Sequence, residues 1–537
     1  MLLSAETLLF YQRCHRRAFL DIYGDVRHKE PESDFLLKLR QDSKAHRQEI
    51  LAEQPYRQPD YDRYHWLAGF QATLELMQQG VERIYRGVLL ADWSKGATLL
   101  SMPDLLVKQS GESDFGNWRY EAHNIKLGKR AKIEYQIVGA FDAQVLAHVQ
   151  GVWPETTWLQ LRKRSPHAVN LQQRVPEMHQ VLDECISMIR DRQDPEVFIS
   201  RQRCSLCHWY NSCHAVAEKQ RHLSLLPGIT PNRYEQLQKI EITSLESLAA
   251  TEVAKLVPLM GEEIAEQLVL QARSTLEERP IWRGDRIVSG GVSSEVVSNP
   301  VTAYLQSNGK LDLSHSSNQK SILNSKKLTQ LTPSYPPIPP YLTADVELHF
   351  DLEAEPELDI DFLFGVLAVD HRAGTEKFYP LIAEKPEDEG KVWLQFLEVV
   401  KAYPDAPIFH FCDYEFKTMS KLAKRYQTPD FLWKPMLDRF VDMHLWMTQT
   451  VVLPVESYAL KAMARWIGFE WRDSLANGAQ CICWYNQWLE TGDRHYLNRI
   501  VEYNEDDCRA TYRVKEWLVE FWQQQLDRPD LEFPSIR

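Results

Sequence analysis

The segment LHFDLEAEP, residues 348–356, decides the fold expected for the C-terminal part of this chain of 537 residues. It is an apolar run that predicts a strand, and it carries Asp351 and Glu353 as a D-x-E pair. Because these acids interrupt an apolar element rather than extend a charged run, they indicate a site rather than a solvated surface. Carboxylate oxygens are the ligands that hard divalent cations such as Mg²⁺ prefer.

A second acidic motif lies near the C-terminus, in VEYNEDDCRATYRVKEWL, residues 501–518. This segment predicts a helix, on which Tyr503 and Asp507 are four residues apart and therefore share a face. Between the two motifs, APIFHFCDYEFKTMSKLA predicts a buried strand followed by a helix. Its candidate acid is Glu415, with Asp413 as the alternative.

These three segments, in this order, resemble the DEDD exonucleases of the RNase H-like fold in their tyrosine-bearing form. The resemblance implies a mixed sheet flanked by helices. It also implies that Asp351, Glu353, Glu415 and Asp507 hold Mg²⁺ or Mn²⁺, while Tyr503 positions the attacking water. Glu415 stands where this family usually has Asp. The implied activity is 3′→5′ exonuclease cleavage.

The N-terminal part is marked by an isolated cysteine and a later group of three: Cys14, Cys204, Cys207 and Cys213. They can form one site only if the fold brings the two ends of the intervening segment together. Four thiolates suit either an iron–sulfur cluster or a structural zinc ion. Zinc could instead use the three later cysteines with His208 or His214.

The residues between these cysteines carry further candidates. Asp104 follows Pro103 in LLSMPDLLVK, which predicts a strand, and Glu121 and Lys126 lie in WRYEAHNIKLGK. The helical stretch IEYQIVGAFDAQVLAHV contains Gln136. His46 lies upstream, in SKAHRQEI.

This order of residues resembles the iron–sulfur members of the RecB-like PD-(D/E)xK nucleases, which include the CRISPR-associated RecB-like and AddB types. The resemblance covers about residues 1–220 and implies a restriction-endonuclease-like domain whose ends are held together by a [4Fe–4S] cluster on the four cysteines. It makes Asp104 a metal ligand and Lys126 the catalytic lysine. His46 would add a ligand or a phosphate contact, and Gln136 would contact nucleic acid.

The chain departs from that family at Asn124, where an acid is expected two residues before Lys126. An amide oxygen can coordinate a metal but brings no charge, so metal affinity should be lower. Glu121, a candidate metal ligand on the same strand, faces the opposite side by strict alternation, and it reaches the site only through a bulge or a twist. Lys129 and Arg130 form a basic patch suited to a phosphate track.

The expected fold class is mixed α/β. We expect four segments: a RecB-like domain at 1–220, a helical, helix-hairpin-helix-like region at 221–285, a linker at 286–343 and an RNase H-like domain at 344–537. The linker assignment rests on composition that is rich in Ser, Asn and Gly and then in Pro, which buries little apolar surface.

Composition is that of an ordinary globular protein, with 44% hydrophobic and 26% charged residues. No apolar run is long enough to span a bilayer, and no basic segment precedes the apolar residues at the N-terminus, so we expect neither a membrane span nor a signal peptide. The expected location is the cytoplasm, where nine cysteines serve as ligands or buried thiols rather than as disulfides. The net charge of −13 does not exclude nucleic acid, because binding depends on local potential.

The sequence therefore predicts a metal-dependent nuclease that acts on nucleic acid, with DNA favoured and RNA left open, in repair or recombination. Any helicase or repair partner is unidentified. The alternative is a catalytically decayed, nucleic-acid-binding scaffold with a structural metal site made of the four cysteines.

Overall fold

The computed structural model describes residues 1–283 and 337–527, so most of the expected linker lies outside the described residues. The chain divides into two compact units, residues 1–224 (unit 1) and residues from 225 onward (unit 2), and each is described by itself. Both units combine helices with mixed sheets, which confirms the mixed α/β class. Among the described residues, no helix is both long enough and apolar enough to cross a membrane.

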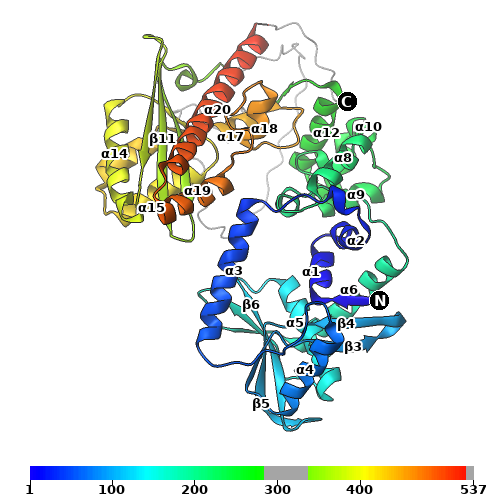
Figure 1. The fold of residues 1–537 in the computed structure, drawn as a ribbon. Coiled ribbons are helices and arrows are strands. Elements are labelled where there is room, and N and C mark those ends of the chain that lie inside the picture. Colours follow the sequence, from blue (N-terminus) through cyan, green and yellow to red (C-terminus); the bar gives the residue numbers. More distant parts are fainter. Residues whose placement is uncertain (284–336, 528–537) are drawn as a thin grey trace, which may run out of the picture. The chain divides into compact units, whose positions relative to one another are not determined.

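Unit 1 contains eight α-helices and eight strands among its described residues, and Figure 1 labels several of them. In chain order they are β1 (Leu2–Ser4), α1 (Ala5–Arg13), α2 (His15–Tyr23), α3 (Asp34–Ala52), α4 (Trp66–Gln78), β2 (Arg83–Tyr85), β3 (Leu89–Trp93), β4 (Ala97–Ser101), β5 (Leu105–Ser113), β6 (Gly116–Lys126), α5 (Ile133–Gln150), β7 (Trp158–Leu161), β8 (His167–Ala168), α6 (Leu171–Arg190), α7 (Arg201–Cys204) and α8 (Tyr210–Gln220).

Helix α5 is the centre of unit 1. It is apolar on nearly all sides, and such a helix is buried rather than placed at the surface. It contacts strands of both sheets of the unit, which have the orders β1-β4-β3 and β2-β5-β6-β7-β8. Strands β5 and β6 are antiparallel, and β6 and β7 are parallel. This arrangement places β6 and β7 beside α5.

Unit 2 begins with a group of helices and continues into a sheet domain. Its elements are α9 (Pro231–Lys239), α10 (Leu245–Ala249), α11 (Val253–Met260), α12 (Glu262–Glu277), β9 (Ile281–Trp282), β10 (Val346–Glu355), β11 (Ile360–Asp370), β12 (Thr375–Ile382), α14 (Glu389–Ala402), β13 (Ile408–His410), α15 (Tyr414–Arg425), α16 (Asp430–Leu437), β14 (Phe440–Asp442), α17 (Met443–Thr450), β15 (Val451–Val452), α18 (Leu460–Trp466), α19 (Gly478–Thr491) and α20 (Arg494–Leu526).

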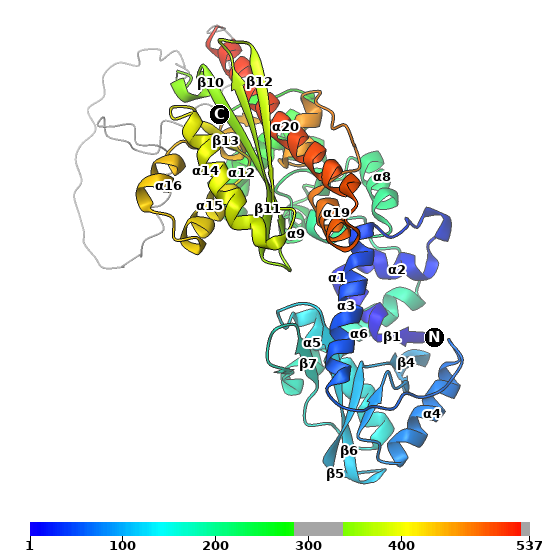
Figure 2. The same ribbon diagram turned by 60° about the vertical axis from the view of Figure 1, so that its left-hand side comes forward.

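The main sheet of unit 2 has five strands in the order β12-β11-β10-β13-β14. The pairs β12–β11 and β11–β10 are antiparallel, whereas β10–β13 and β13–β14 are parallel. Helix α14 packs on one face, and the long helix α20 crosses the other over β10 and β11, as Figures 1 and 2 show. The result is a three-layer domain with β10 at its centre.

The two faces of β10 differ completely in character. Leu348, Phe350 and Leu352 enter the apolar core on the side of α14. The alternate residues from Glu347 to Glu353 are polar or titratable and face α20, because successive side chains in a strand point to opposite sides. Burial of the apolar face contributes about 1.5–3 kcal/mol per large side chain, and this holds the polar face in place.

Gly365 permits α20 to approach the sheet closely. It lies opposite Asp351 in the β10–β11 ladder, and a Cβ atom there would overlap Asn504 Oδ1 of α20. The thiol of Cys508, one turn along the helix, donates a hydrogen bond to the Gly365 carbonyl (3.3 Å). A glycine here therefore sets the spacing between the strand and the helix.

The helices that precede the sheet domain belong to unit 2. Ser244 caps α10 by a reciprocal pair of hydrogen bonds with Ser247. Strand β9 pairs with β15, and Gln271 Nε2 donates to the Leu453 carbonyl (2.7 Å), which joins the helices to the sheet domain. Contact of this region with DNA stays a prediction.

Replacing Gly365 by Ala should destabilise unit 2 by about 1–3 kcal/mol, because the added methyl group displaces Asn504 and α20 from the sheet. Gly478→Ala is the matched control, since its Cβ would lie 3.9 Å from its nearest neighbour, Glu353 Oε2, in a helix. That control should be neutral or stabilise by up to about 1 kcal/mol. Equilibrium denaturant unfolding measures both changes, and equal stabilities of the two variants would contradict this account.

Candidate active site

Three carboxylates meet where β10 faces α20. One oxygen from each of Asp351, Glu353 and Asp507 lies within 4.8 Å of the other two. The first two acids are on alternate positions of β10, just before a register shift between Glu353 and Ala354, and the third comes from the middle of α20. The structure therefore brings together the D-x-E pair and the last acid that the sequence indicated.

Neighbouring side chains hold two of these carboxylates. Asn504 Nδ2 donates to Asp351 Oδ2 (2.7 Å), and Trp471 Nε1 donates to Asp507 Oδ1 (2.7 Å). The Tyr503 hydroxyl also hydrogen-bonds to Asp507, one helical turn away. Tyr503 is thus placed directly beside the acids.

Glu415 is the fourth acid of the site. It lies in the first turn of α15, it is 5% exposed, and its charge acts on both Asp351 and Glu353. Its Oε2 atom lies 3.5 Å from His410 Nδ1 and makes no hydrogen bond within the described part of the chain. The alternative acid, Asp413, is exposed and forms an ion pair with Lys417, so Glu415 is the acid that the fold turns inward.

The carboxylates carry strongly shifted pKa values. Burial, followed by repulsion from neighbouring carboxylates, raises the pKa of Asp351 and of Glu353 well above the usual range. Burial also raises the pKa of Asp507 to about 7, against the hydrogen bonds from Trp471 and Tyr503 that lower it. Like charges gathered out of water are costly unless protons or cations neutralise them.

The donors present fit divalent metal ions. The site offers hard oxygen ligands, and the buried Oε2 atom of Glu415, which has His410 Nδ1 beside it at 3.5 Å, is the kind of acceptor that a cation satisfies. Asp351, Glu353, Asp507 and Glu415 would hold the metal. Tyr503, whose own pKa is raised by burial and then by Asp507, remains a neutral hydroxyl beside them.

Two residues near Asp507 were given no role by the sequence analysis. Trp471 lies outside any motif, and only the fold brings its indole onto Asp507. The ammonium of Lys461 lies 5.4 Å from the Trp471 ring and 6.0 Å from the Tyr503 ring. It donates to the carbonyl of Ser474 (3.1 Å), and burial lowers its pKa. No spacing in the sequence signals either contact.

In unit 1, Asp104 is already neutralised by other residues. Arg47 Nε donates to its Oδ1 atom (2.8 Å), and the backbone N–H of Ile125 donates to its Oδ2 atom (2.7 Å). His46, which precedes Arg47 in α3, is buried, and its ring nitrogens make no hydrogen bond among the described residues. Asp104 therefore lies beside Ile125 of β6, but its carboxylate is paired with Arg47, which takes the place a metal ion would have.

Asn124 belongs to a buried network with an acid that the sequence analysis missed. Its Nδ2 atom donates to Asp142 Oδ2 (2.8 Å) on α5, and Ser101 Oγ donates to Asp142 Oδ1 (2.7 Å). Burial raises the pKa of Asp142 to about 6. Lys126 Nζ lies 3.4 Å from Asn124 Oδ1. Asp142 is a single acid within an otherwise apolar helix, so the hydrophobic periodicity of the sequence did not indicate it.

The other predicted residues of unit 1 lie apart from Asp104. Glu121 is opposite Val107 in the ladder and accepts from Trp158 Nε1 (2.9 Å), so the structure does not bring it to Asp104. Gln136 donates to the Ala131 carbonyl (2.8 Å) and accepts from Arg174 (3.1 Å), so both ends of its amide are engaged. Lys129 and Arg130 are exposed.

The four cysteines gather from the two ends of unit 1. Cys14 lies between α1 and α2, and the other three lie in or beside α7 and α8: Cys204, Cys207 and Cys213. The charge of Cys14 acts on all three, so the two ends of the unit lie near one another, although no three of the four sulfur atoms lie within 4.8 Å of one another. A single metal site on the four cysteines stays a prediction.

Each sulfur accepts a hydrogen bond. Cys14 accepts from the backbone N–H of Arg17 (3.4 Å), and Cys204 accepts from that of Ser200 (3.3 Å). Cys207 accepts from the Trp209 N–H, and Cys213 accepts from the Arg16 side chain. Burial raises the pKa of the three later thiols, in Cys213 to about 11. A metal would be needed to keep them as thiolates, and the N–H donors suit that state.

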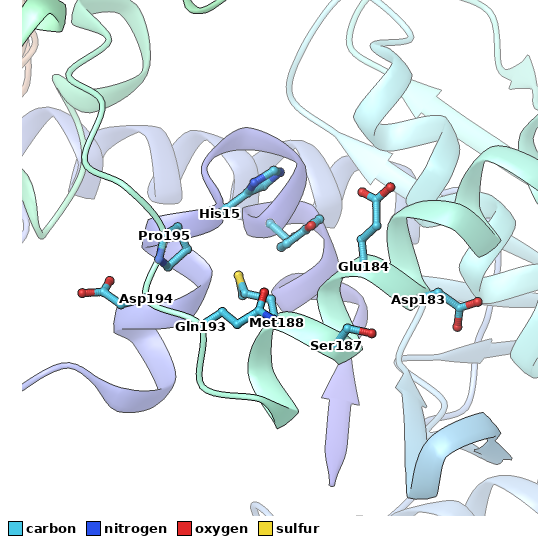
Figure 3. Close-up of a pocket in the computed structure, with 9 residues that line it drawn as sticks. His15, Asp183, Glu184, Ser187, Met188, Gln193, Asp194 and Pro195 are labelled. Atoms are coloured by element: carbon cyan, nitrogen blue, oxygen red, sulfur yellow. The ribbon is translucent and has the colours of Figure 1, made fainter. Parts of the chain in front are cut away.

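A separate pocket lies on unit 1, between the α1–α2 segment and the end of α6 (Figure 3). Its volume is about 570 Å³, and its lining includes His15, Glu184, Met188 and Asp194. The ring of His15 stacks on Tyr11 at 4.1 Å, and Asp194 pairs with Arg16 (2.6 Å). None of the predicted site residues lines it.

Residues 348–519 match the family model described as RNase_H superfamily. Comparison of the chain with curated proteins gives no match. The matched span begins in β10 and ends in α20, so it contains all four acids of the site. Unit 2 therefore contains an RNase H-like domain, a fold whose nucleases cleave nucleic acid with divalent metals.

The metal-free protein should lose stability as the pH rises from about 4 to about 7. The pKa of Asp507 is raised on folding from 3.8 to about 7, so in this window the folded state binds the proton more strongly than the unfolded state. One such group contributes a slope of up to about 1.4 kcal/mol per pH unit. Unfolding in EDTA across this range should therefore show a smaller slope for Asp507→Asn than for wild type.

The control for this experiment is Asp413→Asn, which removes an exposed acid of the same region. It should retain the wild-type slope. Parallel pH profiles for wild type and Asp507→Asn would show that Asp507 does not carry the shifted pKa.

Proposed function

We propose that unit 2 is a metal-dependent nuclease whose RNase H-like domain removes nucleotides from the 3′ end of nucleic acid, with DNA as the favoured substrate. The observation that carries the proposal is the meeting of Asp351, Glu353 and Asp507 within 4.8 Å, with Glu415 buried beside them. Bound Mg²⁺ or Mn²⁺ would supply Lewis-acid activation of water and of the phosphoryl oxygens.

The protein's own residues prepare this reaction. The carboxylates hold the charge that cations require, and Asn504 and Trp471 fix the orientation of two of them. Tyr503 keeps its proton, so its hydroxyl can orient the attacking water by a hydrogen bond. Burial of the acids excludes bulk water from the reacting atoms, which strengthens every electrostatic contact.

Unit 1 serves as a RecB-like, restriction-endonuclease-like nucleic-acid-binding domain in this proposal. The Arg47–Asp104 ion pair and the Asn124–Asp142 hydrogen bond favour binding over cleavage, because both groups that would hold a metal are engaged. The proposal keeps the roles in metal, phosphate or nucleic-acid contact that the resemblance gives to His46, Gln136, Lys129 and Arg130. Lys126, the catalytic lysine of that resemblance, has no cleavage role in this proposal. The pairing of the two units suits DNA repair or recombination.

The cysteine site holds a [4Fe–4S] cluster in this proposal, with a structural role. Support comes from the nearness of Cys14 to the three later cysteines and from the N–H donor to each sulfur, since hydrogen bonds to sulfur tune such clusters. Arg203 Nη1 also donates to the Arg13 carbonyl (3.0 Å), and this hydrogen bond connects the segment around Cys204 to the segment around Cys14. No disulfide joins the nine cysteines, all of which lie within the described residues, and the cytoplasmic location is part of the proposal.

The nuclease proposal is tested with end-labelled single- and double-stranded DNA and RNA in Mg²⁺ or Mn²⁺. Wild type should shorten the substrate stepwise from the 3′ end. Asp351→Asn should lower the rate by at least about 10²-fold, because it removes a charged ligand of the cations. Tyr503→Phe should lower kcat by about 10² with little change in KM, since the hydroxyl acts on the water and not on binding.

Asp413→Asn should cleave at the wild-type rate, and Asp104→Ala should do the same. Loss of cleavage with Asp104→Ala would assign the reaction to unit 1 instead. If wild type shows no metal-dependent cleavage on any substrate, the nuclease proposal fails and the decayed binding scaffold takes its place.

The cluster proposal is tested on anaerobically purified protein. Wild type should carry four irons with matching sulfide and a visible cluster absorbance, and Cys204→Ser should lose both. Cys185→Ser is the control, because Cys185 is buried in the apolar core of unit 1 away from these sulfurs. One zinc and no iron in wild type would replace the cluster by the structural zinc site.

A further inference from the structure

Three cationic side chains of unit 1 surround one tyrosine ring. The guanidinium of Arg13 lies 5.5 Å from the centre of the Tyr135 ring, and the ammonium groups of Lys126 and Lys132 lie 5.7 Å and 6.0 Å from it. Arg13 Nη2 also approaches the tyrosine hydroxyl (3.2 Å). The cations come from α1, the end of β6 and the start of α5, so the fold itself gathers them.

This cationic surface, made of Arg13, Lys126, Lys132 and Tyr135, carries little opposing charge. Glu134 is the carboxylate that contacts it, 3.6 Å from Arg13. The same loop adds Lys129 and Arg130, both exposed, to the positive charge. Each cation gains from the face of the ring, but like charges held together repel one another unless an anion joins them.

Two acids close to Lys126, the half-buried Asp104 and the buried Asp142, are engaged by other groups. Asp104 is held by Arg47 and by the Ile125 N–H, and Asp142 is held by Ser101 and Asn124. The Lys126 ammonium approaches the Asn124 amide oxygen, at 3.4 Å, and its charge also acts on the Asp142 carboxylate. The same ammonium lies at the Tyr135 ring together with Arg13 and Lys132.

Helix α5 adds to the positive potential. It begins beside the surface, with Lys132 at its N-cap, and no side chain caps its first turn. The N-terminal end of a helix carries partial positive charge and free N–H groups. The side chains of Arg13, Lys126 and Lys132 and the N-terminus of α5 thus lie around the Tyr135 ring.

We propose that this cationic surface binds the phosphodiester backbone of a nucleic acid without a metal ion, and that Lys126 is a phosphate contact there. Cations that track phosphates next to an aromatic ring that stacks on bases are the usual combination for single strands. The proposal rests on the nucleic-acid substrate of the proposed function but not on its cleavage chemistry. It gives unit 1 a nucleic-acid-binding role that does not require an acid at position 124, where this chain has Asn.

The test is equilibrium binding of fluorescent single-stranded and duplex DNA to the full chain in EDTA, with Asp351→Asn as background so that no cleavage occurs. Binding is measured over a range of salt concentrations. Lys126→Ala and Lys132→Ala should each reduce the slope of log K against log salt by about 0.7–0.9, the share of one phosphate contact. At about 0.1 M salt this corresponds to an affinity loss of about eightfold for duplex DNA.

Three variants separate this role from others. Arg164→Ala removes an exposed cation elsewhere on unit 1 and should leave the slope unchanged. Lys126→Arg should keep both slope and affinity, because a phosphate contact needs the charge, whereas a catalytic lysine is not replaced by arginine. Tyr135→Leu should weaken single-stranded binding more than duplex binding if the ring stacks on bases.

Equal slopes for wild type, Lys126→Ala and Lys132→Ala would overturn the proposal, and so would binding that appears only with Mg²⁺ or Mn²⁺. Displacement of the DNA by polyglutamate of equal charge at equal concentration would also overturn it, since the surface would then suit an acidic protein. Because cleavage is never measured, failure here leaves the nuclease proposal of unit 2 untouched, and the reverse holds as well.

Discussion

The buried ion pair between Lys515 of α20 and Glu347 of β10 fixes the long helix against the central strand. The two charged atoms are 2.6 Å apart, and the side chains are 2% and 0% exposed. Removing one partner of such a pair leaves an uncompensated buried charge and costs about 3–5 kcal/mol. Together with the close approach of Asn504 to Gly365, the pair determines how far and at what rotation α20 lies from the strand. The acidic site depends on that placement, because Asp507 and Tyr503 are on the helix and Asp351 and Glu353 are on the strand.

The placement has an electrostatic cost that protons or cations remove. Four carboxylates, two buried and two half-buried, lie near one another, and their pKa values rise because burial disfavours the charged forms. The apolar core on the other face of β10, with Phe350, Phe364 and Phe396 in contact, supplies the stability that tolerates this charge. Unit 1 has the opposite electrostatic character, with its acids engaged by arginine or amide groups and its cations left facing one another. The two units thus divide metal binding and phosphate binding between them in this account.

Individual helices and strands were predictable from the sequence where a single hydrophobic periodicity ran through the segment. The apolar runs of β10 and α5 and the i, i+4 spacing of Tyr503 and Asp507 follow from periodicity, and the RNase_H superfamily match confirms the fold expected for the C-terminal part. The contacts made across the fold were not predictable from a single sequence. Trp471 reaches Asp507 from a loop, and Arg47 reaches Asp104 from a helix 57 residues earlier, and neither pairing leaves a local signal. The buried acid Asp142 looked like a break in an apolar helix, and only the tertiary structure shows that Asn124 and Ser101 satisfy it.

Metal binding by the β10–α20 carboxylates is tested most directly by a Mn²⁺-binding isotherm on the full chain, followed by electron paramagnetic resonance. The pH is about 8, above the shifted pKa of Asp507. Wild type should bind Mn²⁺, and Asp351→Asn should lose most of that binding while its fold stays intact. The same substitution should also make the metal-free protein more stable, because one buried charge is gone. Identical isotherms for wild type and Asp351→Asn would contradict the assignment of the β10–α20 carboxylates as the metal site.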